Sequence, residues 1–252
     1  LLLAFLMLST IVSTDVFAQF VTVLPNNNST SGNARAPSVR FSHARAVYLI
    51  TPAEMAASGF INGSLVSGIG WTYQAAGAAG IAGLKVYLEN TSDVAFSKSG
   101  TWATTITGMT LAHDNATTTL AGTTTPDVTF SGGAPFNYSG GGVYVAFDWG
   151  CFGGGLQAIV AMCNTNLANG FLGSQQQVAC PGTPNATLTL VTAFRPETRL
   201  AQPQPLNDLS VTHIYTQGNV AVGYGTPVTI KTRVTNAGVN AMPASTATLN
   251  IT

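Results

Sequence analysis

Short runs of alternating apolar and polar residues recur along the chain, separated by turns rich in Gly, Pro, Asn and Asp. The clearest run, at 84–91, places Leu84, Val86 and Leu88 on one face and polar side chains on the other. Helical stretches of about 10 to 15 residues, which the crossovers of a parallel sheet need, are not visible between the runs. The pattern therefore predicts an all-β fold of the sandwich or barrel kind. The architecture that we expect is a jelly-roll-like β-sandwich followed by a partial immunoglobulin-like β-sandwich.

The turn signals divide the chain into short segments. We expect strands at 39–50, 60–72, 84–91, 102–107, 117–121, 128–130, 143–149, 157–162, 187–194, 209–216, 228–235 and 246–252. One short helix is expected after the first strand, because Thr51 suits an N-cap, Pro52 the first helical position and Glu54 a capping box.

Charged residues make up only 7% of the chain, and the formal net charge is zero. Nucleic-acid binding requires a basic face, so this composition argues against phosphate backbones as partners. Disordered chains combine high net charge with few apolar residues, whereas 46% of these residues are hydrophobic. A folded β protein is favoured.

Residues 1–18 have the character of a secretory signal. The apolar run 1–12 is shorter than the roughly 20 residues that span a bilayer. Ala18, two residues after Val16, suits signal peptidase. We expect an N-terminally truncated signal peptide at 1–18, no transmembrane segment, and a protein that is secreted or displayed on the cell surface.

Composition shifts suggest the domain boundaries. Residues 26–37 lack hydrophobic periodicity, and three prolines stand between 196 and 205. The expected organisation is a flexible lead-in at 19–37, a β-sandwich domain at 38–195, a Pro-rich linker at 196–205 and a partial immunoglobulin-like domain at 206–252.

The three cysteines are Cys151, Cys163 and Cys180. Export into an oxidising compartment favours a disulfide, and both Cys163–Cys180 and Cys151–Cys163 pairings are compatible with the spacing. Buried thiols that pack as small hydrophobes are the alternative. A zinc site is disfavoured, because no Cys-x-x-Cys pair is present and the histidines are distant in sequence.

The sequence contains no recognisable catalytic constellation. The acids show no paired arrangement of the glycosidase kind, and no Gly-x-Ser-x-Gly motif occurs. His113 and Asp114 are adjacent, and neighbouring side chains of a strand point to opposite faces, so we interpret them as a solvated turn rather than a dyad. We expect no enzyme activity, no cofactor and no metal.

Four aromatic residues surround the glycine-rich turns. Tyr138, Tyr144, Trp149 and Phe152 are candidates for an aromatic surface that stacks on a sugar. The alternative, which we favour, is that they fill the interior of the sandwich.

Several segments of the first region resemble a family. The segments 47–54, 84–91, 135–138 and 143–147, together with Trp102, resemble an N-terminal β-sandwich domain of secreted bacterial surface proteins. Such multidomain proteins often end in a type IX secretion sorting domain. The resemblance covers roughly residues 38–198 and implies an architecture rather than an activity.

The C-terminal region resembles a second family. Residues 207–211, 228–230 and 234–238 (NDLSV, VTI and VTNAG) look like the opening of a CARDB domain, the cell-adhesion-related, immunoglobulin-like module of bacteria. The resemblance covers 206–252, about half a module. It implies adhesive or scaffolding roles.

These observations predict a non-catalytic module of a secreted or cell-surface bacterial protein, adhesive or structural in role. Its expected partners are an extracellular glycan or another surface protein, together with further domains of the same polypeptide. Two alternatives remain open: a carbohydrate-binding accessory domain of a secreted hydrolase, and a secreted enzyme whose catalytic domain follows this fragment.

Overall fold

A computed structural model describes residues 18–32, 34–38, 40–150, 160–178, 182–203, 209–215 and 231–236. The chain divides into two compact units, Ala18–Pro203 and the remaining residues. The all-β class is confirmed, because the described residues form antiparallel sheets with only the short helices α1 (Pro52–Ala57) and α2 (Trp102–Thr105). Across the described ranges, no helix is both long enough and apolar enough to cross a bilayer.

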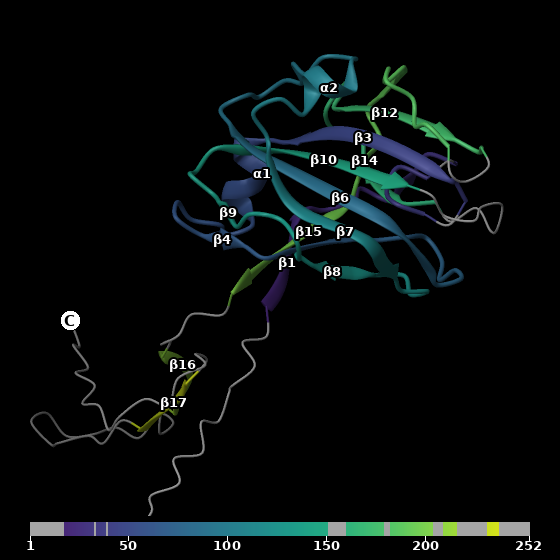
Figure 1. Cartoon of the computed structure of the whole chain (residues 1–252). Coiled ribbons are helices and arrows are strands. Elements are labelled where there is room, and N and C mark those ends of the chain that lie inside the picture. Colours follow the sequence, from purple (N-terminus) through teal and green to yellow (C-terminus); the bar gives the residue numbers. More distant parts are fainter. Residues whose placement is uncertain are drawn as a thin grey trace, which may run out of the picture. The chain divides into compact units, whose positions relative to one another are not determined.

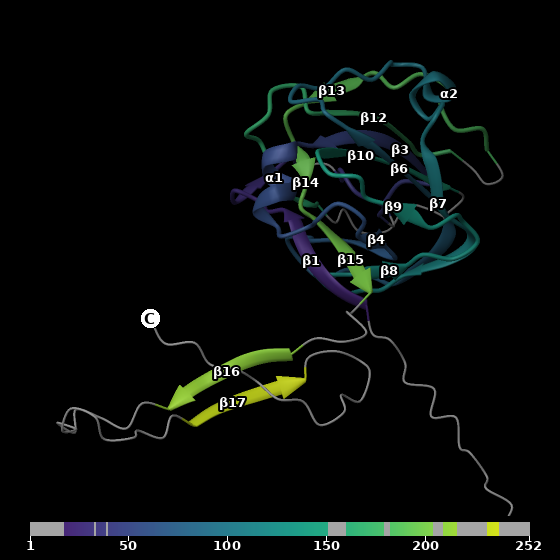
Figure 2. The same cartoon turned by 90° about the vertical axis from the view of Figure 1, so that its left-hand side faces the viewer.

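Two stacked sheets make up most of the first unit. The described strands of the larger sheet follow the order β13 (Leu190–Thr192), β12 (Phe171–Gln176), β3 (His43–Ile50), β10 (Gly142–Gly150), β6 (Gly80–Thr91) and β7 (Thr110–Leu120). The smaller sheet follows the order β1 (Ala18–Leu24), β15 (Thr198–Pro203), β5 (Gly68–Trp71) and β8 (Asp127–Thr129). The two layers are visible in Figures 1 and 2, with β3, β10 and β6 in one and β1, β15 and β8 in the other.

Short strand pairs complete the unit. One sheet joins β14 (Arg195–Pro196), β11 (Met162–Asn164) and β2 (Ser29–Thr30), and another joins β4 (Leu65–Val66) to β9 (Phe136–Asn137). β2, β4, β9 and β14 lie on chain segments that connect the two main sheets, whereas β11 lies between β10 and β12 of the larger sheet.

The space between the sheets is filled by the apolar faces of their strands. Trp71 of β5 crosses Phe147 of β10 edge to face, with 5.9 Å between ring centroids. Two polar rings of this layer are hydrogen-bonded: Trp71 Nε1 donates to Tyr48 Oη at 3.1 Å, and Tyr48 Oη lies 2.8 Å from Thr198 Oγ1. Burial raises the pKa of Tyr48, so the phenol stays neutral in this core.

The larger sheet also buries part of its outer face. Val47, Leu49 and Ala146 of β3 and β10 contact Trp102 of α2 and Leu188. A strand buried on both faces reads as a nearly continuous apolar run, which explains the segments 46–50 and 143–147.

The predicted capping box is confirmed at α1. The Thr51 hydroxyl accepts from Glu54 N at 3.4 Å, and Glu54 Oε2 accepts from Thr51 N at 2.8 Å. Arg195 of β14 binds the same carboxylate, so the start of this helix is tied to a strand distant in sequence.

The structure differs from the expected organisation at both ends of the sandwich domain. Residues 19–37 contain β1 and β2 instead of a flexible lead-in, and the expected linker 196–205 contains β15 between β1 and β5. The sequence did not predict β1, because apolar and polar residues alternate only weakly in 18–24. It did not predict β15, because the prolines of 196–205 disfavour a strand. Pro196 and Pro203 are tolerated because they stand at strand ends, where a missing N–H costs little.

The prediction of a strand at 102–107 is wrong, because this segment contains the helix α2. Trp102 and Ile106 stand four residues apart, so one helical turn points both at the outer face of the larger sheet. Trp102 meets Tyr87 of β6 edge to face, with 5.9 Å between centroids.

The second unit contains an antiparallel pair, β16 (Leu209–Tyr215) and β17 (Lys231–Asn236). These strands match the expected segments 209–216 and 228–235 apart from their ends. The expected strand at 246–252, the signal peptide up to residue 17 and the first half of the expected strand at 157–162 lie outside the described residues.

Candidate functional site

Four charged side chains stand in one row across the outer face of the larger sheet. Arg45 of β3 is directly opposite Asp148 of β10, Asp148 is opposite Lys85 of β6, and Lys85 is opposite Asp114 of β7. Charges therefore alternate in sign from strand to strand, although the chain has only nine cations and nine acids. Opposite charges at cross-strand positions stabilise a sheet.

The row consists of two ion pairs. Arg45 Nε and Nη2 lie 2.9 and 2.8 Å from Asp148 Oδ2, and Lys85 Nζ lies 2.9 Å from Asp114 Oδ2. Each carboxylate thus uses one oxygen, and its Oδ1 has no hydrogen-bond partner among the described residues. The hydrogen bond to Asp114 raises the pKa of Lys85, which keeps this amine charged.

Arg45 is fixed on three sides. Its guanidinium lies over the Trp102 ring, 5.2 Å from the centroid, and Nη1 donates to Asn185 O at 2.9 Å. Both side chains of the Arg45–Asp148 pair are 16% exposed. The free oxygen of Asp148 is therefore presented from a rigid position.

A second row lies two residues further along the same strands. His43 of β3 is opposite Gly150 of β10, which is opposite Gly83 of β6. A Cβ on Gly150 would lie 3.4 Å from His43 Nδ1, so glycine makes room there for the imidazole ring. The two glycines leave a strip of bare backbone beside the charged row.

His43 is 4% exposed, and neither ring nitrogen has a hydrogen-bond partner in the described part of the chain. A buried polar group without a partner costs free energy, and native structures contain few of them. The His43 imidazole is therefore the strongest indication that the outer face of the larger sheet binds a ligand.

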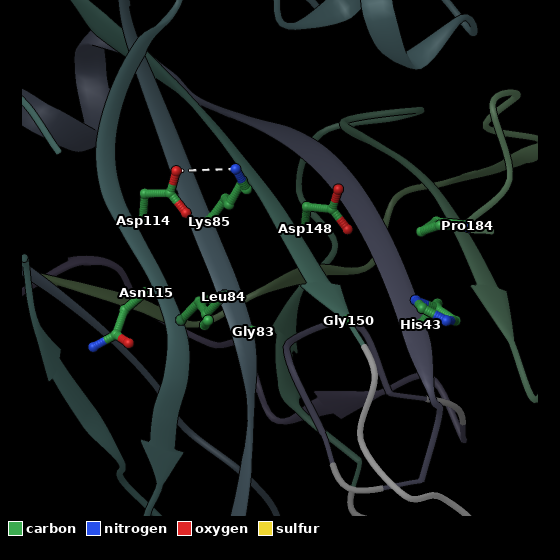
Figure 3. Close-up of a pocket in the computed structure, with 10 residues that line it drawn as sticks. His43, Gly83, Leu84, Lys85, Asp114, Asn115, Asp148, Gly150 and Pro184 are labelled. Atoms are coloured by element: carbon green, nitrogen blue, oxygen red, sulfur yellow. Dashed lines mark hydrogen bonds and ion pairs between the residues drawn. The ribbon is translucent and has the colours of Figure 1, made fainter. Parts of the chain in front are cut away.

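The two rows line a cleft of about 380 Å³ whose far side is formed by Pro184. In Figure 3, Lys85 and Asp114 are joined across neighbouring strands, and His43 lies beyond Gly150 toward Pro184. A volume of roughly 300 to 1,000 Å³ with a few convergent polar groups is typical of small-ligand sites.

Metal binding receives no support from the described residues, among which no three His, Cys, Asp or Glu side chains gather as a metal site. The row geometry gives the reason, because Lys85 stands between the two carboxylates. An ammonium group in that position competes with a cation for the same oxygens.

The predicted aromatic candidates lie elsewhere. Tyr138, Tyr144 and Trp149 are all buried, Trp149 in the layer between the sheets, and Phe152 lies outside the described residues. The three described rings therefore do not form an exposed stacking surface. Alternation along β10 directs Tyr144 and Trp149 into apolar layers on opposite faces of the sheet, and Tyr138, which follows β9, packs in the core. Tyr144 Oη donates to Asp93 Oδ2 at 2.7 Å, and burial raises the pKa of Tyr144 to about 12.

Cys163 is a free, buried thiol whose Sγ lies 3.3 Å from Ala161 O. Burial raises the pKa of this thiol to about 12. Cys151 and Cys180 lie outside the described residues, so the expected pairing with either of them stays a prediction.

His113 and Asp114 are not a dyad, as the sequence indicated, but they stand in β7 and not in a turn. His113 points inward, where Nδ1 accepts from Ser131 N at 3.0 Å and Nε2 lies 2.8 Å from Thr118 Oγ1. Asp114 points to the outer face. Neighbouring strand positions separate the two side chains.

Sequence reasoning missed the cleft. The polar positions of 84–91 were visible, but the partners Arg45, Asp148 and Asp114 come from three other strands whose register the sequence does not reveal. The usable signal was weak: charged residues are scarce, and Arg45, Lys85 and Asp148 interrupt strands that are otherwise mainly apolar.

No protein-family model, curated protein or solved structure matches the chain. The functional argument therefore rests on the site itself.

Proposed function

We propose that this chain is a non-catalytic recognition module of a secreted or cell-surface bacterial protein, and that it makes its adhesive contact through the cleft on the outer face of the larger sheet. The observation that carries the proposal is the His43 imidazole, which has no hydrogen-bond partner among the described residues. It lies beside two ion pairs that each leave one carboxylate oxygen without a partner in the same set of residues. Fixed polar groups whose hydrogen-bonding positions are not used by the described residues are available to a bound ligand.

The charge arrangement favours binding over catalysis. General acid catalysis by a carboxyl group needs a site that keeps it protonated near neutral pH. Asp148 and Asp114 are instead each held in an ion pair, within 3 Å of a cation. Held in place by these pairs, the two carboxylates can accept hydrogen bonds from hydroxyl or amide donors of a ligand.

The support for an exported module is the sequence: a signal-like start and a C-terminal segment that looks like the opening of a CARDB domain. The sandwich suits this role, because a cleft on hydrogen-bonded strands is held rigidly and loses little entropy on binding. The partner of such a module is an extracellular glycan or another surface protein.

The test is a binding screen of the full chain against immobilised extracellular glycans and matrix proteins. Gly83→Trp fills the cleft, and the backbone tolerates a side chain there because a Cβ would lie 3.5 Å from its nearest neighbour, Gly150 O. Val191→Trp is the matched control, since Val191 is exposed on β13 and does not line the cleft.

We expect wild type and Val191→Trp to bind the same panel members, and Gly83→Trp to lose at least roughly tenfold in affinity, or about 1.4 kcal/mol. Equal binding by a folded Gly83→Trp variant would overturn the assignment of the cleft. A panel to which none of the three proteins binds would overturn the recognition role.

A further inference from the structure

The ligand class of the cleft follows from its donors, acceptors and charge, on the basis that the proposed recognition role is right. We infer that the cleft binds a single uncharged sugar ring, the terminal or exposed residue of a neutral glycan, with the His43 imidazole as a direct hydrogen-bond partner of a ring hydroxyl.

The charge balance excludes the other polar ligand classes. Arg45 is neutralised by Asp148 and Lys85 by Asp114, so the charged row sums to zero. An anionic or cationic ligand entering the cleft would find no unmatched counter-charge, and its desolvation would be uncompensated. A neutral ligand avoids this cost.

The hydrogen-bonding groups match hydroxyls. Within the described part of the chain, Asp148 Oδ1 and Asp114 Oδ1 are acceptors without a partner, and the Lys85 ammonium has hydrogens beyond the one given to Asp114. The two ring nitrogens of His43 add further hydrogen-bonding positions. A hydroxyl both donates and accepts. Vicinal hydroxyls on a ring can therefore serve neighbouring donors and acceptors of this row at once.

The floor of the cleft matches the C–H face of a sugar. Gly83 and Gly150 carry no side chains, so the C–H face of a ring can lie against their Cα atoms, and Pro184 bounds the cleft. An apolar floor beside a polar row is the amphipathic pattern that a pyranose presents. The space of about 380 Å³ is small, which favours one ring over a long chain.

The orphan nitrogens of His43 make the inference specific. The ring is held in the second row against Gly150, and it lines the cleft although it is only 4% exposed. A ligand hydroxyl would provide the hydrogen bond that the described protein groups do not.

The test is histidine ring nitrogen NMR of the full chain during titration with four probes: methyl glucoside, methyl galactoside, glucuronate and glucosamine. We expect at least one neutral glycoside to shift the His43 signals saturably, and the charged probes to bind at least roughly tenfold more weakly. The signals of His113 are an internal control, because both of its ring nitrogens already have partners.

Two variants sharpen the result. His43→Leu identifies the shifted signals and is expected to weaken neutral-sugar binding by at least roughly tenfold, while Val191→Trp leaves it unchanged. Stronger binding of a charged probe, or sugar binding that does not move His43, overturns the inference.

Failure of the sugar inference can be distinguished from failure of the proposed recognition role. Panel binding that Gly83→Trp abolishes, combined with no response of His43 to any neutral glycoside, keeps the cleft as the contact site and overturns the sugar. Panel binding unaffected by Gly83→Trp overturns both.

Discussion

Arg195 and Glu54 form a two-pronged ion pair: Nη1 lies 2.8 Å from Oε2, Nη2 lies 2.7 Å from Oε1, and the arginine side chain is fully buried. The same guanidinium donates to Leu49 O at 2.7 Å and to Asn164 Oδ1 at 2.9 Å. One arginine thus joins β14, α1, β3 and β11.

Removing the carboxylate from this pair should destabilise the fold severely. Glu54→Ala leaves a buried guanidinium without its counter-charge and also removes the capping box, so we expect a loss of about 3 to 5 kcal/mol in the free energy of unfolding. Urea denaturation measures it. Glu89→Ala is the comparison, because its pair with Lys98 is partly exposed and should be worth at most about 1 kcal/mol. Equal losses would contradict the structural role assigned to Arg195.

Stability should depend on pH through His113. Burial lowers the pKa of this imidazole, whose Nδ1 accepts from Ser131 N. The unfolded state therefore binds a proton first, so the free energy of unfolding should be constant above the ordinary histidine pKa of about 6.5 and fall as pH drops below it. Denaturant midpoints between about pH 7.5 and 5.5 measure this window above the carboxylate range. His113→Gln should flatten the slope, and an unchanged slope would refute the assignment.

Trp149→Ala should act through stability. Because the indole lies fully buried between the sheets, the substitution should cost about 3 to 5 kcal/mol. Urea denaturation of this variant, beside the milder Trp149→Phe, measures the cost. A native-like stability for Trp149→Ala would mean that the ring is exposed, as a sugar-stacking surface requires.

His43→Leu should leave the free protein at least as stable as wild type. The substitution removes two buried nitrogens without partners and keeps an apolar group of similar length against Gly150. We expect a gain of about 0.5 to 2 kcal/mol, as is common where a polar group is retained for binding. A clear loss would show that the imidazole has a structural partner and would weaken the case for the cleft.

Cys163 should be unreactive until the protein unfolds. Its thiol is buried and its pKa is raised to about 12, so iodoacetamide should leave it unmodified in the native state. Peptide mapping after labelling in urea without reductant then separates two cases. Labelled Cys163 identifies the free thiol of the structure, and a Cys163–Cys180 or Cys151–Cys163 disulfide would require a reductant first.

Local sequence patterns were sufficient to predict the features that depend only on residues close together in the sequence. Alternation at 84–91 predicted a strand with one buried face, and Thr51 with Glu54 predicted the capping box. Long-range pairing decided the rest. The partnership of β1 with β15 joins residues some 180 positions apart, and the turn at Trp102 is helical because the outer face of the larger sheet offers its ring a place.

The candidate site lay beyond the reach of the sequence for the same reason. Arg45, Lys85, Asp114 and Asp148 form a row only because four strands pair in one register, and a slip by one residue would send each side chain to the opposite face. The sequence therefore showed the charges without their neighbours.

The most direct measurement is a crystal structure of the chain grown with a saturating concentration of a neutral methyl hexoside. The account predicts one sugar ring lying over Gly83 and Gly150, with a hydroxyl within hydrogen-bond distance of a His43 ring nitrogen and another near the free oxygen of Asp148. A cleft without sugar, together with a protein group bonded to His43 or a sugar bound on another face, would contradict it.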